Sequence, residues 1–278
     1  MFDQKRAAAL TAAALVALTG CGTGDADAEE SVPLPEDPGV ERLGVEVIDV
    51  FDHDPAAFTQ GLELRDGVFY ESTGLYGSSD VRLVEPGTGE VIDSQALPDD
   101  EFGEGLTLTE DALWQITWQE GVAYQRDLET LDVTDTVEYE GEGWGLCSLD
   151  RFTAPELAEG GERLVMSDGT STLTFRDPAT FAATGTVEVT LDGTELTQIN
   201  ELECVDGQVW ANVWQTDEIV RIDPATGEVG AVVDASGLLT EDEAGPADVL
   251  NGIAAGETEG TFYITGKLWP HMFLVRFV

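Results

Sequence analysis

The chain has 278 residues, of which 56 are acidic and 12 are lysine or arginine, so its formal net charge is −44. A chain of this length buries a substantial core and suffices for one all-β domain of above-average size. The charge excludes nucleic acid and anionic membrane surfaces as partners, because both are bound through clustered lysine and arginine.

Residues 1–20 have the composition of a signal peptide. Two basic residues before position 7 precede a short apolar run, which is too short to span a membrane and ends in Leu18-Thr-Gly-Cys21. This ending resembles a bacterial lipobox, which implies lipidation of Cys21; an ordinary secretory signal with an incidental cysteine is the alternative. We therefore expect an extracytoplasmic protein, secreted or held to a membrane only by a lipid at Cys21. Residues 21–40 are expected to form a flexible acidic tether.

From residue 41 onward the sequence repeats itself. Gly61–Thr73 is echoed by Gly105–Thr117 and Glu201–Val213, and each copy predicts a strand, a tight turn and a second strand. A further strand pair around an Asp-Pro-x-Thr turn follows in most copies, as in Ile219–Val229. Five such units begin at positions 61, 105, 145, 201 and 252. Four strands in each period of about 40–55 residues indicate a β-propeller.

The fifth unit reaches Val278 after about three strands. Residues Leu43–Phe51 are strand-like and would supply the missing outer strand, which would close the ring. We therefore predict an all-β fold for residues 41–278, a five-bladed β-propeller closed by an N-terminal strand. We expect this domain to be a monomer.

Equivalent positions of different blades meet at the mouth of a propeller's central channel, so register identifies candidate site residues. Polar and aromatic residues precede the repeat starts, namely Phe58, Gln60, Phe102, Glu104, Trp144, Asn200 and Asn251. The first connection inside a blade carries Trp118, Trp214 or Lys267, and Lys267 is the only lysine after the leader. Each residue alone has an ordinary explanation, such as a solvated carboxylate or a turn cap. Their shared register is what indicates a site, whereas Trp114 and Trp210 lie in strand interiors and are expected to be core.

Several of these motifs, in order along residues 43–278, resemble those of the plant-type glutaminyl cyclases, the metal-independent glutaminyl-peptide cyclotransferases of plants and bacteria. The motifs that carry the resemblance are Phe58-Thr-Gln-Gly-Leu62, Phe102-Gly-Glu-Gly-Leu-Thr107, Gly143-Trp-Gly-Leu146, Ile199-Asn-Glu-Leu-Glu203, Trp210-Ala-Asn-Val-Trp214, Leu250-Asn-Gly-Ile-Ala254 and Thr265-Gly-Lys-Leu-Trp-Pro270. The resemblance implies conversion of N-terminal glutamine of peptides or proteins to pyroglutamate, with release of ammonia. It also implies a five-bladed propeller, which agrees with the repeat count.

The resemblance assigns roles by position. It implies a catalytic set of Glu104, Asn200 and Lys267. It implies a substrate pocket that comprises Phe58, Gln60, Phe102, Trp118, Trp144 and Trp214. No cofactor and no metal are expected, and with only His53 and His271 in the chain a zinc-dependent mechanism is not expected.

Some interpretations stay open from sequence. Cys147 and Cys204 are either a disulfide, which export permits, or two separately buried thiols. A calcium-dependent lactonase-like hydrolase could use Glu104, Asn200 and Asn251 around a metal, although Lys267 in the same mouth would repel the cation. A non-enzymic lipoprotein with a propeller binding platform is a further alternative.

The acidic excess predicts dependence on salt. Repulsion among carboxylates opposes compaction, and dissolved ions screen that repulsion. We therefore expect a protein adapted to a salty setting.

Overall fold

The structure is a computed structural model that describes residues 39–149 and 161–278. The predicted signal peptide, Cys21 and all but the last residues of the predicted tether lie outside the described residues. Within the described part, no helix is long and apolar enough to cross a membrane. The described residues form one compact unit.

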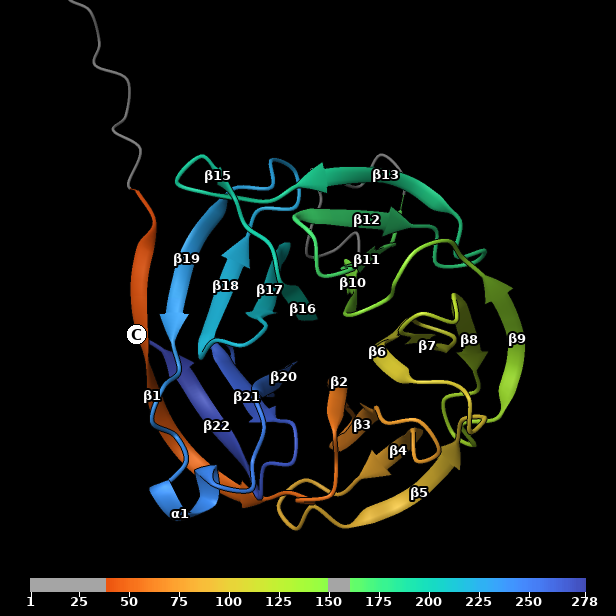
Figure 1. The fold of residues 1–278 in the computed structure, drawn as a ribbon, viewed down its shortest axis with the longest axis horizontal. Helices are drawn as coiled ribbons and strands as arrows, with labels where there is room; N and C mark the ends of the chain where they lie inside the picture. The colour runs from red at the N-terminus through yellow and green to blue at the C-terminus, as the bar shows by residue number, and fades with distance from the viewer. Residues whose placement is uncertain (1–38, 150–160) are drawn as a thin grey trace, which may run out of the picture. The chain divides into compact units, whose positions relative to one another are not determined.

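Three separate four-stranded antiparallel sheets make up the first half of this unit, and their strands follow chain order from the centre outward (Figure 1). The first contains β2 (Thr59–Arg65), β3 (Val68–Thr73), β4 (Asp80–Val84) and β5 (Val91–Ala96). The second contains β6 (Gly103–Leu108), β7 (Leu113–Thr117), β8 (Val122–Arg126) and β9 (Val133–Glu138). The third contains β10 (Leu146–Leu149), β11 (Arg163–Met166), β12 (Thr172–Arg176) and β13 (Ala183–Glu188).

The remaining long strands form one eight-stranded sheet. It comprises β16 (Ile199–Val205), β17 (Gln208–Val213), β18 (Glu218–Ile222), β19 (Val229–Asp234), β1 (Glu41–Asp52), β22 (His271–Phe277), β21 (Thr261–Gly266) and β20 (Leu250–Ala255), in that spatial order. A small hairpin, β14 (Thr190–Leu191) with β15 (Thr194–Glu195), and a short helix, α1 (Glu241–Ala244), complete the described elements.

Strand β1 joins the two ends of the ring. Its last part pairs antiparallel with β22, from Val45 opposite Phe277 to Asp52 opposite His271, so the predicted outer strand is confirmed. Its first four residues also pair parallel with β19, which the sequence did not predict. This second pairing is possible because β1 has 12 residues and runs past the end of β22. The result is a continuous sheet where separate units were expected.

Turn chemistry explains where the hairpins form. Asp66-Gly67 and Asp206-Gly207 link first and second strands with all four residues at positive φ, the geometry that two-residue hairpins favour. In three of the outer hairpins an aspartate opens the turn, namely Asp127, Asp177 and Asp223. For example, Asp177 Oδ1 accepts from the backbone N–H of Ala179 at 3.0 Å and of Thr180 at 2.9 Å.

The hydrophobic core lies between neighbouring sheets. One cluster joins residues of β10–β12 to residues of β16–β19, and another joins β7 and β8 to β10 and β11. The innermost strands contribute one buried aliphatic side chain each at the same repeat position, Leu62, Leu106, Leu146, Leu202 and Ile253, all at most 1% exposed. Replacing such a residue by alanine costs about 2–5 kcal/mol of stability, so this layer holds the ring together.

Candidate active site

Irregularities in the innermost strands position the polar residues of the site. The pairing of β2 with β3 shifts register at Gln60, and that of β6 with β7 shifts around Glu104. The same shift occurs in β16 at Asn200 and in β20 at Asn251. A β-bulge bends its strand and re-aims the side chain at the extra residue. Four strands therefore present a polar side chain at the same end of the ring.

The residue that follows the second strand of the second, fourth and fifth repeat units supplies a second layer. Trp118 follows β7, Trp214 follows β17 and Lys267 follows β21. The next residue is in the left-handed region at Gln215 (φ 66°) and Leu268 (φ 61°). Few residues other than glycine adopt this conformation, so these turns are held by their surroundings. Here, Leu268 N–H donates to Ala57 O at 2.7 Å, which fixes the segment around Lys267 against the residues that precede β2.

These residues line a cavity of about 240 Å³. Its walls are Phe58, Gln60, Phe102, Glu104, Trp118, Trp144, Asn200, Trp214, Asp248 and Lys267. All nine residues that the sequence placed in the catalytic set and pocket are therefore brought together. Asp248 was missed, although its position three residues before Asn251 was a signal that it lies near the same rim.

Glu104 is the buried acid of this cavity, with 5% of its surface exposed. Gln60 Nε2 donates to its Oε1 at 3.0 Å, and Asn251 Nδ2 in turn donates to Gln60 Oε1 at 3.3 Å. Within the described part of the chain, Glu104 Oε2 has no hydrogen-bond partner. One oxygen is thus held by Gln60, while the other is a buried acceptor without a partner in the described chain.

Burial raises the pKa of Glu104 well above its usual value, because a carboxylate is poorly solvated there. The Lys267 ammonium opposes this effect, and the nearby carboxylates of Glu120 and Glu142 add to it. A carboxyl group with a raised pKa holds a proton more readily than an ordinary glutamate does, which favours its use as a general acid. The site therefore contains a group suited to general acid and base work.

Lys267 is the buried cation, with 4% of its surface exposed. Its Nζ lies 4.9 Å from the centroid of the Phe58 ring, within cation–π range. Burial lowers the pKa of Lys267, and the carboxylates of Glu104 and Asp248 act in the opposite direction. The ammonium is a compact donor inside a cavity that is otherwise mostly aromatic.

Aromatic rings meet edge to face around the cavity. Phe102 contacts Phe58 with ring centroids 6.2 Å apart and Trp118 at 5.7 Å. Trp144 and Trp214 lie 5.5 Å apart with an interplanar angle of 84°. Such a wall excludes water and packs against an aliphatic chain. Trp114 and Trp210 lie in the core, 1% and 8% exposed, as predicted.

Cys147 and Cys204, whose pairing the sequence left open, form a disulfide. It joins β10 of the third sheet to β16 of the eight-stranded sheet, with Cα atoms 5.4 Å apart. It therefore ties two innermost strands together. Neither cysteine lines the cavity around Glu104.

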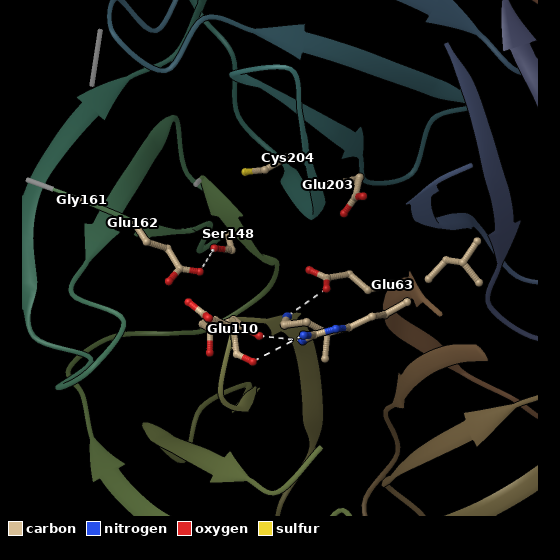
Figure 2. Close-up of a pocket in the computed structure, with 11 residues that line it drawn as sticks. Glu63, Glu110, Ser148, Gly161, Glu162, Glu203 and Cys204 are labelled. Atoms are coloured by element: carbon tan, nitrogen blue, oxygen red, sulfur yellow. Dashed lines mark hydrogen bonds between the residues drawn. The ribbon is translucent and has the colours of Figure 1, made fainter. Parts of the chain in front are cut away.

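A second and larger cavity, of about 660 Å³, lies elsewhere in the ring (Figure 2). Its lining includes Glu63, Arg65, Glu162 and Glu203, and no residue is shared with the cavity around Glu104. Glu63 is already satisfied, because its two oxygens accept from Thr107 Oγ1 at 2.5 Å and from Leu108 N–H at 2.9 Å. The larger volume of this second cavity therefore does not make it the candidate active site. The cavity around Glu104 is the one that holds a buried acid, an amide and an amine.

The residues proposed for a calcium site are arranged differently. Asn251 Nδ2 donates to Thr59 O at 2.9 Å and to Gln60, and Asn251 does not line the cavity. Among residues 39–149 and 161–278, no three His, Cys, Asp or Glu side chains are grouped so as to hold a metal ion. Asn251 is therefore separated from the cavity that Glu104 and Asn200 line.

A ring of β-sheets with a buried acid and a buried amine in one aromatic-walled cavity indicates an all-β enzyme. The chain matches the family model described as "Glutamine cyclotransferase" over residues 13–277. It is 40% identical over 238 residues to a glutaminyl-peptide cyclotransferase of Arabidopsis thaliana, covering 84% of this chain and 71% of that protein. The crystal structure of Myxococcus xanthus glutaminyl cyclase matches with a TM-score of 0.74 and 38% identity, covering 86% of this chain and 98% of the other. The chain belongs to the glutamine cyclotransferase family.

Proposed function

We propose that this chain is a glutaminyl-peptide cyclotransferase, which converts the N-terminal glutamine of peptides or proteins to pyroglutamate and releases ammonia. Membership of the glutamine cyclotransferase family and the Arabidopsis relative support this activity. The observation that carries the proposal is the enclosure of Glu104, Lys267 and Asn200 in one small cavity with aromatic walls.

Substrate enclosure is the first task of such a site. The α-amine of the substrate attacks the carbon of its own side-chain amide, so no nucleophile from the enzyme is required. Holding the glutamine side chain in a folded conformation supplies a high effective concentration of amine at the amide. The walls formed by Trp118, Trp144 and Trp214 suit the aliphatic stem of this side chain.

Two proton transfers remain, and Glu104 is placed for both. Its carboxylate accepts a proton from the attacking nitrogen as the new C–N bond forms. It then delivers that proton to the amide nitrogen, the old C–N bond breaks, and ammonia leaves with the bonding electron pair. Gln60 holds one carboxylate oxygen at 3.0 Å, and Oε2 accepts no protein hydrogen bond in the described chain, so we assign the proton transfers to Oε2.

The tetrahedral intermediate carries an oxyanion on the former amide carbonyl. We assign its stabilisation to the Lys267 ammonium and the Asn200 amide, which line the same cavity. Asn200 Oδ1 has no partner in the described chain, and either end of an amide can be presented by rotation of the group. Phe58 and Phe102 complete the substrate walls.

The architecture and location of the enzyme are further parts of the proposal. Counting β16–β19 as a fourth blade and β20–β22 with β1 as a fifth gives a five-bladed propeller whose last two blades share β1. The lipobox-like Leu18–Cys21 supports export and lipid anchoring at Cys21. Replacing Cys21 by serine is expected to move the protein from the membrane fraction to the soluble fraction of its host, and retention in the membrane fraction would argue against the anchor.

Replacing Glu104 by glutamine tests the function. Ammonia release from a dipeptide that begins with glutamine is expected to fall at least about 100-fold, because the proton carrier is removed. The fold is expected to be unchanged, since a glutamine oxygen can still accept from Gln60. Thermal unfolding and ammonia release should be measured beside the exposed control Glu90→Gln, which should behave as wild type.

Two results would contradict the proposal. Substantial turnover by Glu104→Gln would show that Glu104 is not the proton carrier. Absence of ammonia release by the wild type would show that the chain does not have the proposed activity. EDTA should leave the rate unchanged, whereas a calcium-dependent hydrolase would lose its activity.

A further inference from the structure

Two tryptophans of the cavity wall share one hydrogen-bond acceptor. Trp118 Nε1 donates to Glu142 Oε2 at 2.9 Å, and Trp144 Nε1 donates to the same oxygen at 3.1 Å. The other oxygen of Glu142 accepts from Gln119 Nε2 at 3.0 Å. Both oxygens are therefore occupied by protein donors, and neither indole N–H remains for a substrate.

The three partners come from different elements. Trp118 follows β7 in the second sheet, whereas Glu142 and Trp144 lie in the connection from β9 to β10 of the third sheet. An indole has only two side-chain torsions, so a hydrogen bond at its N–H together with an edge contact restricts the ring strongly. Here Phe102 supplies the edge contact for Trp118 and Trp214 supplies it for Trp144.

We propose that Glu142 is a positioning residue, which fixes the Trp118 and Trp144 indoles in the geometry that folds the glutamine side chain for attack. The inference rests on the proposed cyclotransferase activity. Glu142 acts through the two indoles and does not line the cavity itself. Its charge has a second effect, because it adds to the burial of Glu104 in raising the pKa of that group.

Carboxylate chemistry explains why glutamate suits this position. A carboxylate offers only acceptors and each indole offers only a donor, so one glutamate oxygen accepts from both rings while the other accepts from Gln119 Nε2. In Glu142→Gln one amide oxygen replaces the charged carboxylate as acceptor for the indoles, and Gln119 must turn its own oxygen toward the new NH₂ to keep its hydrogen bond. Glu142→Ala removes the acceptor altogether, and Glu142→Asp keeps the charge on a shorter stem.

Steady-state kinetics on a glutamine-initiated dipeptide test the role. Glu142→Ala is expected to lower kcat/KM about 10- to 100-fold with a fall of at least about fivefold in kcat, because misplacing a positioning wall reduces the reactive population. Glu142→Asp should recover part of the loss. Glu140→Gln, an exposed charge change two residues away, should match wild type. A change confined to KM, or kcat/KM within about twofold of wild type, would overturn the proposal.

Indole resonances give a test that does not require activity. The chain has six tryptophans, and ¹⁵N–¹H spectra of Trp118→Phe and Trp144→Phe identify the two signals concerned. Both are expected to shift in Glu142→Gln and to stay in place in Glu140→Gln. Unshifted signals in Glu142→Gln would overturn the positioning role of Glu142 even if the enzyme is a cyclase. If the signals shift in Glu142→Gln but the wild type releases no ammonia, the positioning role of Glu142 stands and the proposed function is refuted.

Discussion

Glu104 and Lys267 lie in one cavity, and burial acts on them in opposite directions. Burial raises the pKa of the acid and lowers the pKa of the amine, because each charged form is poorly solvated. Their mutual attraction partly opposes both shifts. Both groups are therefore brought toward the pH range in which a proton can be exchanged between them and a substrate.

This arrangement predicts a bell-shaped pH profile for kcat/KM. Glu104 must be ionised to accept a proton, so activity should fall as the pH drops through its raised pKa, which lies above the ordinary value of 4.5. Lys267 must be charged, so activity should fall again as the pH rises through its lowered pKa, below 10.5. Rates on one dipeptide between about pH 4 and 10 measure both limbs.

Loss of a proton from the substrate's α-amine could also produce an acidic limb, and a variant that changes the pKa of Glu104 distinguishes the two groups. The charged or ionisable groups that act on or near Glu104 are Lys267, Glu120, Glu142, Tyr76 and Tyr139. Glu120→Gln removes a carboxylate that raises the pKa of Glu104, so the acidic limb should move to lower pH. An acidic limb that stays in place would assign that limb to another group.

Lysine and arginine should not be interchangeable at position 267. The side chain is 4% exposed and its Nζ lies over the Phe58 ring inside a cavity of about 240 Å³. A guanidinium is wider than an ammonium and does not lose its charge. Lys267→Ala and Lys267→Arg are each expected to lower kcat/KM at least about 100-fold. Recovery of more than about tenfold by arginine relative to alanine would contradict this expectation.

The innermost strands carry both the site and the closest packing of the ring. A β-carbon at Gly105 would lie 2.6 Å from Leu146 N, and one at Gly145 would lie 2.1 Å from Asn200 O. Side chains are thus excluded where neighbouring strands touch. The fourth unit departs from this rule, since Glu201 occupies the equivalent position. Its carboxylate accepts from Leu62 N–H at 3.3 Å and Ile253 N–H at 2.9 Å, so it links β16 to β2 and β20.

The disulfide between β10 and β16 predicts a stability effect without a catalytic effect. It spans a sequence separation of 57 residues, and a cross-link of that loop length stabilises by about 4 kcal/mol through the unfolded chain. A variant with both Cys147→Ser and Cys204→Ser should unfold at lower denaturant concentration. Its kcat/KM should stay within about twofold of wild type, because the cavity around Glu104 contains neither cysteine.

Reducing agent gives a matched control. It should lower the stability of the wild type toward that of the double variant and leave the double variant unchanged. Equal stability of the two proteins under oxidising conditions would show that the cross-link contributes little.

At the scale of the whole molecule, ring closure and charge are the main physical features. Closure depends on β1, which pairs with β22 and β19 at once. The fold must also bury carboxylates: burial raises the pKa of Glu63 to about 7 and raises those of Glu201 and Glu203. A carboxyl group with a raised pKa in the folded state contributes stability below its unfolded value, and that stability is lost as the pH rises through the folded value.

Stability is therefore expected to increase with salt. The net charge of −44 creates repulsion that dissolved ions screen, so the Tm should rise between low and molar NaCl. The increase in Tm with salt should be larger at pH 8 than at pH 6, because Glu63, whose pKa is raised to about 7, adds a further negative charge at the higher pH. Thermal unfolding at both pH values measures it. A Tm that is flat or falls with salt would contradict the prediction.

The sequence by itself determined the strand units, the closing strand and the core tryptophans. Its register and family motifs together also selected nine of the ten residues that line the cavity around Glu104, although register alone also selected Asn251, which does not line it. These follow from local patterns: strand and turn preferences set the elements, and equivalent positions of a repeated unit meet near its axis. Only the tertiary structure decided the joining of β1 to β19, the bond between Cys147 and Cys204, the place of Asp248 and the contact of Glu142 with two indoles. It also decided the pKa shifts of Glu104 and Lys267. Those features depend on distances and burial between residues far apart along the chain, which close packing sets and no local pattern encodes.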